Sequence, residues 1–149
     1  MSAPLDVVRR NIDAWNKGDI DSRLSTLYFP QYRITGTGSL VEELEEVIGE
    51  KWKLALKFVV EYENWDHSEI DEVEIIHSSE NKVHLALVFG RYRADGLRYA
   101  SMKSFWIMSK FDGVWRRTLA SNLPLEYYLP EDEISMIRQR KHEILGPIF

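Results

Sequence analysis

Residues 92–117, YRADGLRYASMKSFWIMSKFDGVWRR, contain two Asp-Gly turns, and the segment between the turns is apolar on both faces when it is read with a period of two. The first face carries Tyr99, Phe105 and Ile107, and the second face carries Ala100, Met102, Ser104, Trp106 and Met108. Antiparallel strands that face solvent on one side usually alternate apolar and polar residues. The segment therefore predicts a strand that is covered on both faces.

The length and composition of the chain predict one domain with its own core. The chain has 149 residues, of which 44% are hydrophobic, and single domains commonly have this size. It has no cysteine, which excludes disulfides, thiolate nucleophiles and cysteine-bound zinc or iron–sulfur sites. The longest apolar runs fall far short of the roughly 20 residues that span a bilayer, so we expect a soluble, cytoplasmic protein with no membrane partner.

The distribution of charge argues against a nucleic-acid partner. The formal net charge is -5, and the one basic cluster, RQRK at residues 138–141, lies beside the acidic residues 131–133. A nucleic-acid-binding domain usually carries an extended basic stripe. We therefore expect no contact with nucleic acid.

The first part of the chain predicts three helices. Apolar residues recur at helical spacing in the first 16 residues, and Asp19 is placed to cap a second helix that includes Leu27 and ends before Pro30. A short strand and a glycine-containing loop follow. Ser39 and Glu42 have the spacing of a capping box, which predicts a third, longer helix from this point.

The second part of the chain predicts a sheet and a final helix. From residue 67 the apolar period changes to two, and turn signals at 78–81, 95–96 and 112–113 divide the sequence into four strands of a meander. The last stretch, PEDEISMIRQRKHEILG, has acidic residues at its start and basic residues near its end. A helix dipole favours this order of charges, so we expect a C-terminal helix.

This order of elements resembles the nuclear transport factor two-like superfamily, whose members include polyketide-cyclase-like, ketosteroid-isomerase-like and scytalone-dehydratase-like proteins. The resemblance covers about residues 5–123 and rests on AWNKGDIDSRLSTLYFP, on the strands around ADG, and on FDGVWRRTLASN. It implies an α+β, cystatin-like fold in which a curved antiparallel sheet forms a cone closed by N-terminal helices. Residues 1–123 would form the cone, and residues 124–149 would add a C-terminal helical extension of the same domain.

The resemblance also implies an internal ligand pocket and a dimer interface on the outer sheet face. A three-residue loop, Ala94-Asp95-Gly96, would pair even-numbered residues with even-numbered ones. One face would then be bulky, with Val83, Leu85, Leu87, Phe89, Tyr99, Phe105 and Ile107. The other would be small and partly polar, with His84, Ala86, Val88, Gly90, Tyr92, Ala100, Met102, Ser104 and Trp106. We expect the pocket on the second face and a homodimer through the first.

The catalytic residues of the characterised relatives are missing from the matching positions. Where the ketosteroid isomerases carry their tyrosine and two aspartates, this chain has Arg10, Gly36 and Ser104. The aspartate-arginine-aspartate triad of the limonene epoxide hydrolases falls on Ala86, Val88 and Ala120. The histidine pair of the scytalone dehydratases has no match, and His84 is the one candidate on the predicted inner face.

His84 is therefore the candidate catalytic acid–base residue, although an ordinary strand-end histidine would fit the same position. The candidate ligand-binding residues are Trp15, Tyr32, Trp52, Tyr92, Met102, Ser104, Trp106, Thr118 and Asn122. The histidines show no metal-ligand spacing, so we expect no metal and no cofactor.

These features predict a protein that binds a small, largely apolar metabolite in an internal pocket. Cyclic metabolites are among the candidate ligands. Such a protein could isomerise, dehydrate or cyclise its ligand by acid–base chemistry. The alternative is a non-catalytic dimeric assembly or scaffold domain of the same fold, which the missing carboxylates favour.

Overall fold

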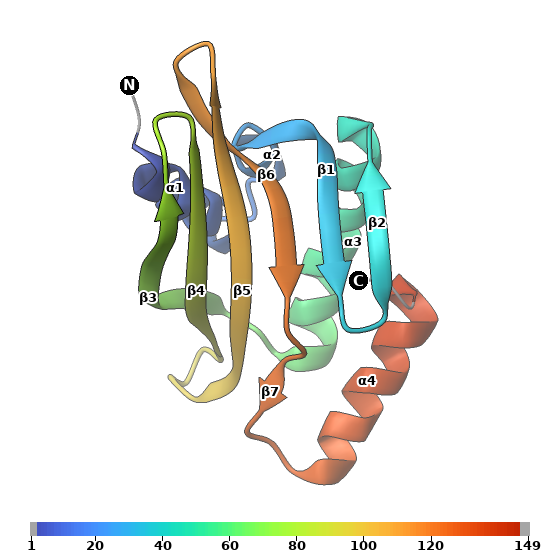
Figure 1. The fold of residues 1–149 in the computed structure, drawn as a ribbon. Coiled ribbons are helices and arrows are strands. Elements are labelled where there is room, and N and C mark those ends of the chain that lie inside the picture. The colour runs from blue at the N-terminus through green and yellow to red at the C-terminus, as the bar shows by residue number, and fades with distance from the viewer. Residues whose placement is uncertain (1–2, 147–149) are drawn as a thin grey trace.

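The computed structural model describes residues 3–146 as four helices and seven strands (Figure 1). The helices are α1 (Pro4–Asn16), α2 (Ile20–Leu24), α3 (Glu45–Glu63) and α4 (Glu131–Leu145). The strands are β1 (Leu27–Thr35), β2 (Gly38–Glu42), β3 (His67–Ser78), β4 (Lys82–Tyr92), β5 (Arg98–Phe111), β6 (Val114–Asn122) and β7 (Glu126–Tyr127).

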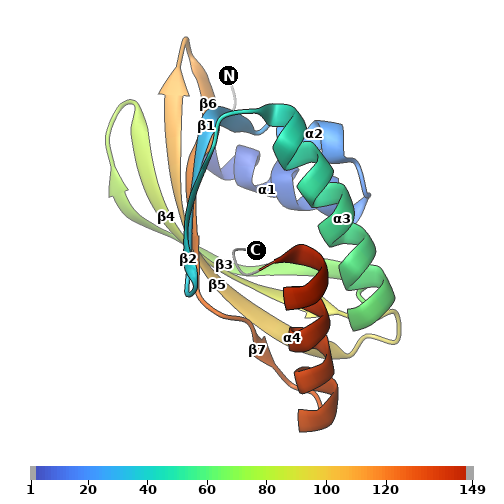
Figure 2. The ribbon, with the colours of Figure 1, turned by 90° about the vertical axis from the view of Figure 1, so that its right-hand side faces the viewer.

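The strands form one curved sheet in the order β2-β1-β6-β5-β4-β3, with β7 paired to β5. All of these pairings are antiparallel except that between β1 and β6. Figure 2 shows that the sheet curves around the helices, all of which lie on its concave side. The concave face is therefore covered, whereas no element of the described chain lies over the convex face.

The predicted α+β class, the four-strand meander and the C-terminal helix are confirmed, but two local predictions are wrong. The second helix ends at Leu24, and Leu27 already belongs to β1. Ser39 and Glu42 lie in β2 rather than capping a helix. Both errors have one cause: pairing with distant β6 extends β1, and the β1–β2 hairpin builds on that strand.

A β-bulge at Tyr99 decides which side chains face the inside of the cone. Next to the turn, Tyr92 pairs with Arg98 as the loop predicts, but Arg91 pairs with Ala100, so Tyr99 is an extra residue in β5. One extra residue reverses the facing of every later pair. Beyond the bulge, odd-numbered residues of β4 therefore pair with even-numbered residues of β5.

Because of this bulge, the predicted combination of β4 and β5 residues on each face of the sheet is wrong. The concave face combines Val83, Leu85, Leu87 and Phe89 with Met102, Ser104, Trp106 and Met108. The convex face combines His84, Ala86, Val88 and Gly90 with Phe105 and Ile107. The bulky residues of β4 thus contribute to the core, and the residues expected in a pocket lie on the outside.

The core fills the concave side in two clusters. Val8 and Ile12 of α1 pack against the β4 and β5 residues Leu85 and Trp106 in one cluster. The other cluster joins α3 to α2, the bulge region and Ile137 of α4, which is fully buried. The C-terminal helix thus shares a core with the cone.

The register can be tested with neighbouring residues of β4. Leu87 is 2% exposed, so Leu87→Lys should bury an unpaired charge and reduce the free energy of unfolding by about 4 kcal/mol or more. Val88→Lys, on the convex face opposite Glu72, should reduce it by less than about 1 kcal/mol. Urea denaturation measures both values. Equal losses, or a larger loss for Val88→Lys, would contradict this register.

Candidate functional site

A cavity of about 400 Å³ lies between the concave face of the sheet and helices α3 and α4. Its walls are aromatic and aliphatic, with Trp15, Trp52, Phe58 and Trp106 among them. Its lining extends to the β1–β2 turn and to the last two turns of α4. Volumes of this size accommodate small organic ligands.

Seven of the predicted ligand-binding residues border this cavity: Trp15, Tyr32, Trp52, Met102, Ser104, Trp106 and Asn122. Tyr32 borders the cavity, but its register partners, Val41 and Leu119, place its side chain on the convex side, where it is 45% exposed. Ser104 donates a hydrogen bond to Asn122 Oδ1 at 2.5 Å. The two polar residues therefore satisfy each other at the cavity wall.

His84 does not face the cavity. The bulge places its ring on the convex face, edge-on to Phe105 at 5.6 Å and to His77 at 5.7 Å between ring centroids. Its Nε2 atom is buried and has no hydrogen-bond partner among the described residues. Burial, followed by the charges of Lys82 and His77, lowers the pKa of His84. A residue in this position cannot exchange a proton with a ligand inside the cone.

Thr118 is also outside the cavity because a second bulge lies in β6. Ile107 pairs with Leu119 and Met108 with Arg117, so Thr118 is an extra residue. Its hydroxyl lies 3.1 Å from Ser109 Oγ and donates to the Ile107 carbonyl at 3.2 Å. The bulge turns Arg117 rather than Thr118 toward the cavity.

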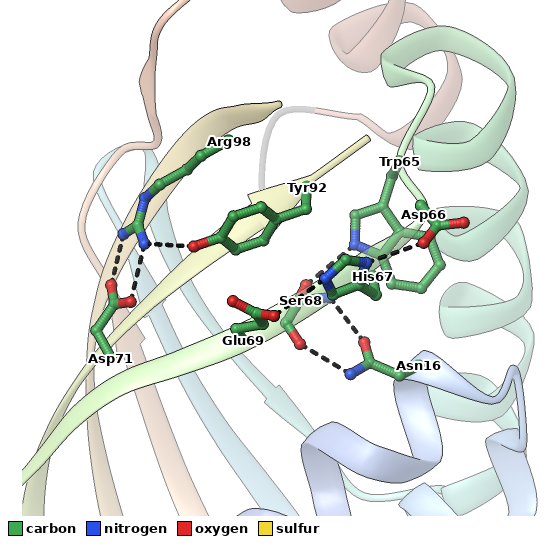
Figure 3. A network of polar contacts seen from close by, with 9 residues as sticks. All are labelled: Asn16, Trp65, Asp66, His67, Ser68, Glu69, Asp71, Tyr92 and Arg98. Atoms are coloured by element: carbon green, nitrogen blue, oxygen red, sulfur yellow. Dashed lines mark hydrogen bonds and ion pairs between the residues drawn. The ribbon is translucent and has the colours of Figure 1, made fainter. Parts of the chain in front are cut away.

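Tyr92, the third predicted residue outside the cavity, belongs to a polar cluster at the start of β3 (Figure 3). Its ring stacks on His67 at 5.1 Å, and His67 contacts Asp66 at 2.9 Å and Glu69 at 3.3 Å. The hydrogen bond to Asp66, aided by Glu69, raises the pKa of His67. The cluster is solvent-exposed and serves to fix the chain that enters the sheet.

The same cluster ties four elements together, namely α1, β3, β4 and β5. Arg98 binds both carboxylate oxygens of Asp71, at 2.8 and 2.5 Å, and donates to the Tyr92 hydroxyl at 3.0 Å, which connects β5 to β3 and β4. Asn16 at the end of α1 exchanges two hydrogen bonds with the backbone of Ser68, as Figure 3 shows. These contacts have a structural role.

Two arginines that we did not predict lie in the aromatic part of the cavity. The Arg23 guanidinium lies 4.5 Å from the Trp15 ring centroid and 4.1 Å from that of Trp52. The Arg117 guanidinium lies 4.7 Å from the Trp106 centroid and 6.0 Å from that of Trp52. Arginine over a tryptophan face is a favourable cation–π arrangement. Both cations therefore lie around the same indole ring.

A neutral amide orients each arginine through its Nε atom. Arg23 donates to Asn11 Oδ1 at 3.0 Å, and Asn11, which is fully buried, is itself held by a 2.8 Å hydrogen bond to Thr26. Arg117 donates to Gln31 Oε1 at 3.3 Å, and the Gln31 amide group donates to the carbonyls of Tyr28 and Arg117. Within residues 3–146, the terminal nitrogens of these two arginines have no hydrogen-bond acceptor.

A buried carboxylate, Glu63, lies at the other end of the cavity. Its Oε1 accepts from Arg91 at 2.9 Å and from Tyr99 at 2.7 Å, and its Oε2 accepts from Tyr127 at 3.2 Å. Burial, together with the nearby carboxylate, raises the pKa of both tyrosines well above its ordinary value. Three donors already occupy the oxygens of Glu63, so this residue is suited to a structural role rather than to contact with a ligand.

Lys141 of α4 also lines the cavity, close to Arg91 and Arg33. Burial, followed by the charge of Arg91, lowers the pKa of Lys141 to about 8; Glu63 opposes this shift, and the charge of Arg33 adds a smaller lowering effect. Together with the arginines it makes the cavity strongly basic. Among residues 3–146, no three histidine, cysteine, aspartate or glutamate side chains are placed to hold a metal ion.

The basic residues could not be recognised from residue type alone. Arginines on a short helix and at a strand start are usually solvated, and the predicted facing of β6 lacked its bulge. One available signal was the spacing of Asn11 and Trp15, which places both on the face of α1 that contacts Arg23.

Comparisons with known proteins identify the fold. No family model matches the chain, and no curated protein matches its sequence. Solved structures do match, among them an NTF2-like protein of unknown function from Pseudomonas putida KT2440, at 9% identity and a TM-score of 0.67 over 85% of this chain and 92% of that one. A cystatin-like protein of unknown function from Nostoc punctiforme matches at 13% identity and 0.65, over 85% and 90%.

A third match is a candidate aromatic ring hydroxylase from Novosphingobium aromaticivorans, at 13% identity and a TM-score of 0.58 over 85% of this chain and 87% of that one. At these identities the likeness concerns the fold. The chain thus has the cystatin-like, nuclear transport factor two-like fold that its sequence resembles. No helix in residues 3–146 is long and apolar enough to cross a bilayer.

The lowered pKa of Lys141 predicts a stability effect that depends on pH. The folded-state pKa of about 8 lies below the ordinary value of 10.5, so the unfolded chain binds more protons between these two values and the charge of Lys141 costs stability below about pH 8. Lys141→Met should raise the free energy of unfolding by about 1–3 kcal/mol at pH 7. The gain should shrink as the pH approaches 10.5.

Urea denaturation at pH 7 and pH 10 tests this, with Lys57→Met at an exposed position of α3 as the control. The control should show no gain that depends on pH. A gain for Lys141→Met of equal size at both pH values would mean that Lys141 keeps its ordinary pKa.

Proposed function

We propose that this protein binds a small organic molecule with a ring-shaped or hydrocarbon body in its internal cavity. The observation that carries the proposal is the cavity of about 400 Å³ whose wall includes three tryptophans, Trp15, Trp52 and Trp106. Flat aromatic walls suit a flat apolar ligand. Ser104 and Asn122 add polar groups to the same wall, where they can orient such a ligand.

Binding is better supported than catalysis. The histidine expected to act as an acid–base residue is outside the cavity, and the Glu63 carboxylate already accepts three hydrogen bonds. Two further titratable side chains of α4 line the cavity, Lys141 and His142, and among the described residues neither of them is paired with a second acid–base group aimed at a ligand. Binding a ligand requires no acid–base residue, so the residues that line the cavity are sufficient for this role.

A thermal-shift screen of ketones, phenols, lactones and aromatic acids tests the proposal. A ligand that binds only the folded state at about 100 times its dissociation constant should raise the melting temperature by roughly 5–10 °C. Ser104→Trp should fill the cavity and abolish the shift, at a cost of about 1–3 kcal/mol in stability. Lys103→Trp, on the adjacent convex-face residue, is the matched control and should keep the shift. A broad screen without any shift, or retained binding in Ser104→Trp, would refute the proposal.

A second candidate role, homodimer assembly, is favoured by the convex face. Phe105, Ile107, Val88 and Leu119 are only partly buried there, and Tyr32, Ile34 and Val41 continue the apolar surface onto β1 and β2 with exposures of 45%, 46% and 52%. His84 Nε2 is a buried polar atom on the same face without a partner in the described chain. A second copy of the chain would cover the apolar residues and could supply a hydrogen bond to His84.

Sedimentation velocity at micromolar concentration tests this second role. The wild type should sediment as a dimer, and Phe105→Glu should sediment as a folded monomer because it places a charge in a desolvated interface. Lys57→Glu, on α3 away from the convex face, should remain a dimer. A monomeric wild type, or a dimeric Phe105→Glu, would exclude assembly through this face.

A further inference from the structure

The charge inside the cavity is unbalanced. Two carboxylates line it, and both have partners: Glu42 pairs with Lys51, and Glu63 pairs with Arg91 at 2.9 Å. Arg23 and Arg117 have no carboxylate partner among the described residues, although both lie within the cavity lining. Taking a cation out of water costs several kcal/mol unless an opposite charge compensates it. The cavity therefore keeps a positive charge that nothing described in the chain neutralises.

The two arginines are arranged like the sides of a clamp. Each is fixed at Nε by a neutral amide, Asn11 or Gln31, and each stacks against an indole, so neither side chain is free to turn away. Their terminal nitrogens, which carry most of the donors of a guanidinium, make no hydrogen bond to residues 3–146. Arg117 is only 9% exposed, so its remaining donors face the cavity rather than open solvent.

The electrostatic surroundings agree with this arrangement. Burial is the main cause that lowers the pKa of both guanidinium groups, and Arg117 and Arg33 lower that of Arg23 further through their charges. Lys141 and Arg91 extend the basic lining toward α4. An anion between the arginines would relieve this repulsion and satisfy the unused donors at the same time.

The geometry points to an organic oxyanion as the ligand of this site, with a carboxylate or phosphate bound by Arg23 and Arg117 and an aromatic or hydrocarbon body packed against the tryptophans. This inference rests on the proposed function and names the class of ligand. A guanidinium binds a carboxylate or phosphate through two parallel hydrogen bonds, which a neutral amide or alcohol cannot reproduce. The negative charge is thus required for tight binding, and contacts of the apolar body with the tryptophans increase the affinity further.

Calorimetric titration of the wild type with matched probes tests the requirement for charge. Phenylacetate and indole-3-acetate represent the carboxylates, phenyl phosphate represents the phosphates, and phenylacetamide and indole-3-acetamide are the neutral counterparts. At least one anion should bind about 30-fold or more tightly than its amide, the factor expected for one desolvated charge pair. Raising the salt concentration should weaken the binding of the anion and leave that of the amide unchanged.

Variants of the two arginines test their role. Arg23→Met and Arg117→Met should each weaken the binding of the anion about 30-fold or more and change that of the amide by less than about threefold. Arg10→Met, at an exposed position of α1, is the matched control and should bind like the wild type. The free variants should remain folded by circular dichroism, since each loses a charge that burial destabilises together with one hydrogen bond to Asn11 or Gln31. A purely structural arginine would instead weaken the binding of the anion and of the amide by the same factor.

The outcomes separate this inference from the function on which it rests. If amides and anions bind the wild type equally, the cavity is a ligand site but the oxyanion assignment is wrong. If the anions bind tightly and the arginine variants keep full affinity, the anion is bound elsewhere and its assignment to Arg23 and Arg117 is wrong. If neither class binds while the folded state is intact, both the ligand site and the inference fail. The comparison of carboxylate with amide uses only the wild type, so it decides the question even if a variant does not fold.

Discussion

The whole interior of this protein depends on one extra residue in β5. Tyr99 interrupts the pairing of β4 with β5, and it is fully buried with its hydroxyl bound to Glu63 at 2.7 Å. Because a shift of one residue moves every side chain of a strand to the other face, this bulge determines that Leu85 and Trp106 point inward and that His84 points outward. The hydrogen bond that anchors Tyr99 to α3 therefore stabilises the register and, through it, the composition of the cavity wall.

The cavity that results differs in character from an ordinary core. Tryptophan rings and aliphatic residues are typical of an apolar core. Arginines held by neutral amides are not typical of one, because an uncompensated charge does not stabilise an apolar core. At Glu63 the same chain matches a buried carboxylate with three donors. The contrast between a balanced site and an unbalanced one within a single cavity is the feature that an anionic ligand explains, since functional sites are where a fold tolerates such a mismatch.

The sequence predicted what local signals can determine. Two Asp-Gly turns and a change to period two located the meander, and the charge order after Pro130 located α4. Long-range pairing was beyond those signals: Leu27 belongs to a strand because it pairs with β6, ninety residues away, and not because of its neighbours. The candidate site could be predicted only in part, because its remaining residues depend on the same long-range pairing. Trp52 and Trp106 were found by spacing, whereas His84 and Thr118 were assigned to the wrong side because the bulges in β5 and β6 leave no local mark in the sequence.

A crystal structure with 4-bromophenylacetate tests the central claim most directly, because anomalous scattering locates the bromine and fixes the direction of the molecule. The account predicts that the carboxylate lies within hydrogen-bond distance of the terminal nitrogens of Arg23 and Arg117, with the ring against Trp52 or Trp106. A molecule bound on the convex face, a carboxylate that points away from both arginines, or a cavity that stays empty at saturating concentration would contradict it.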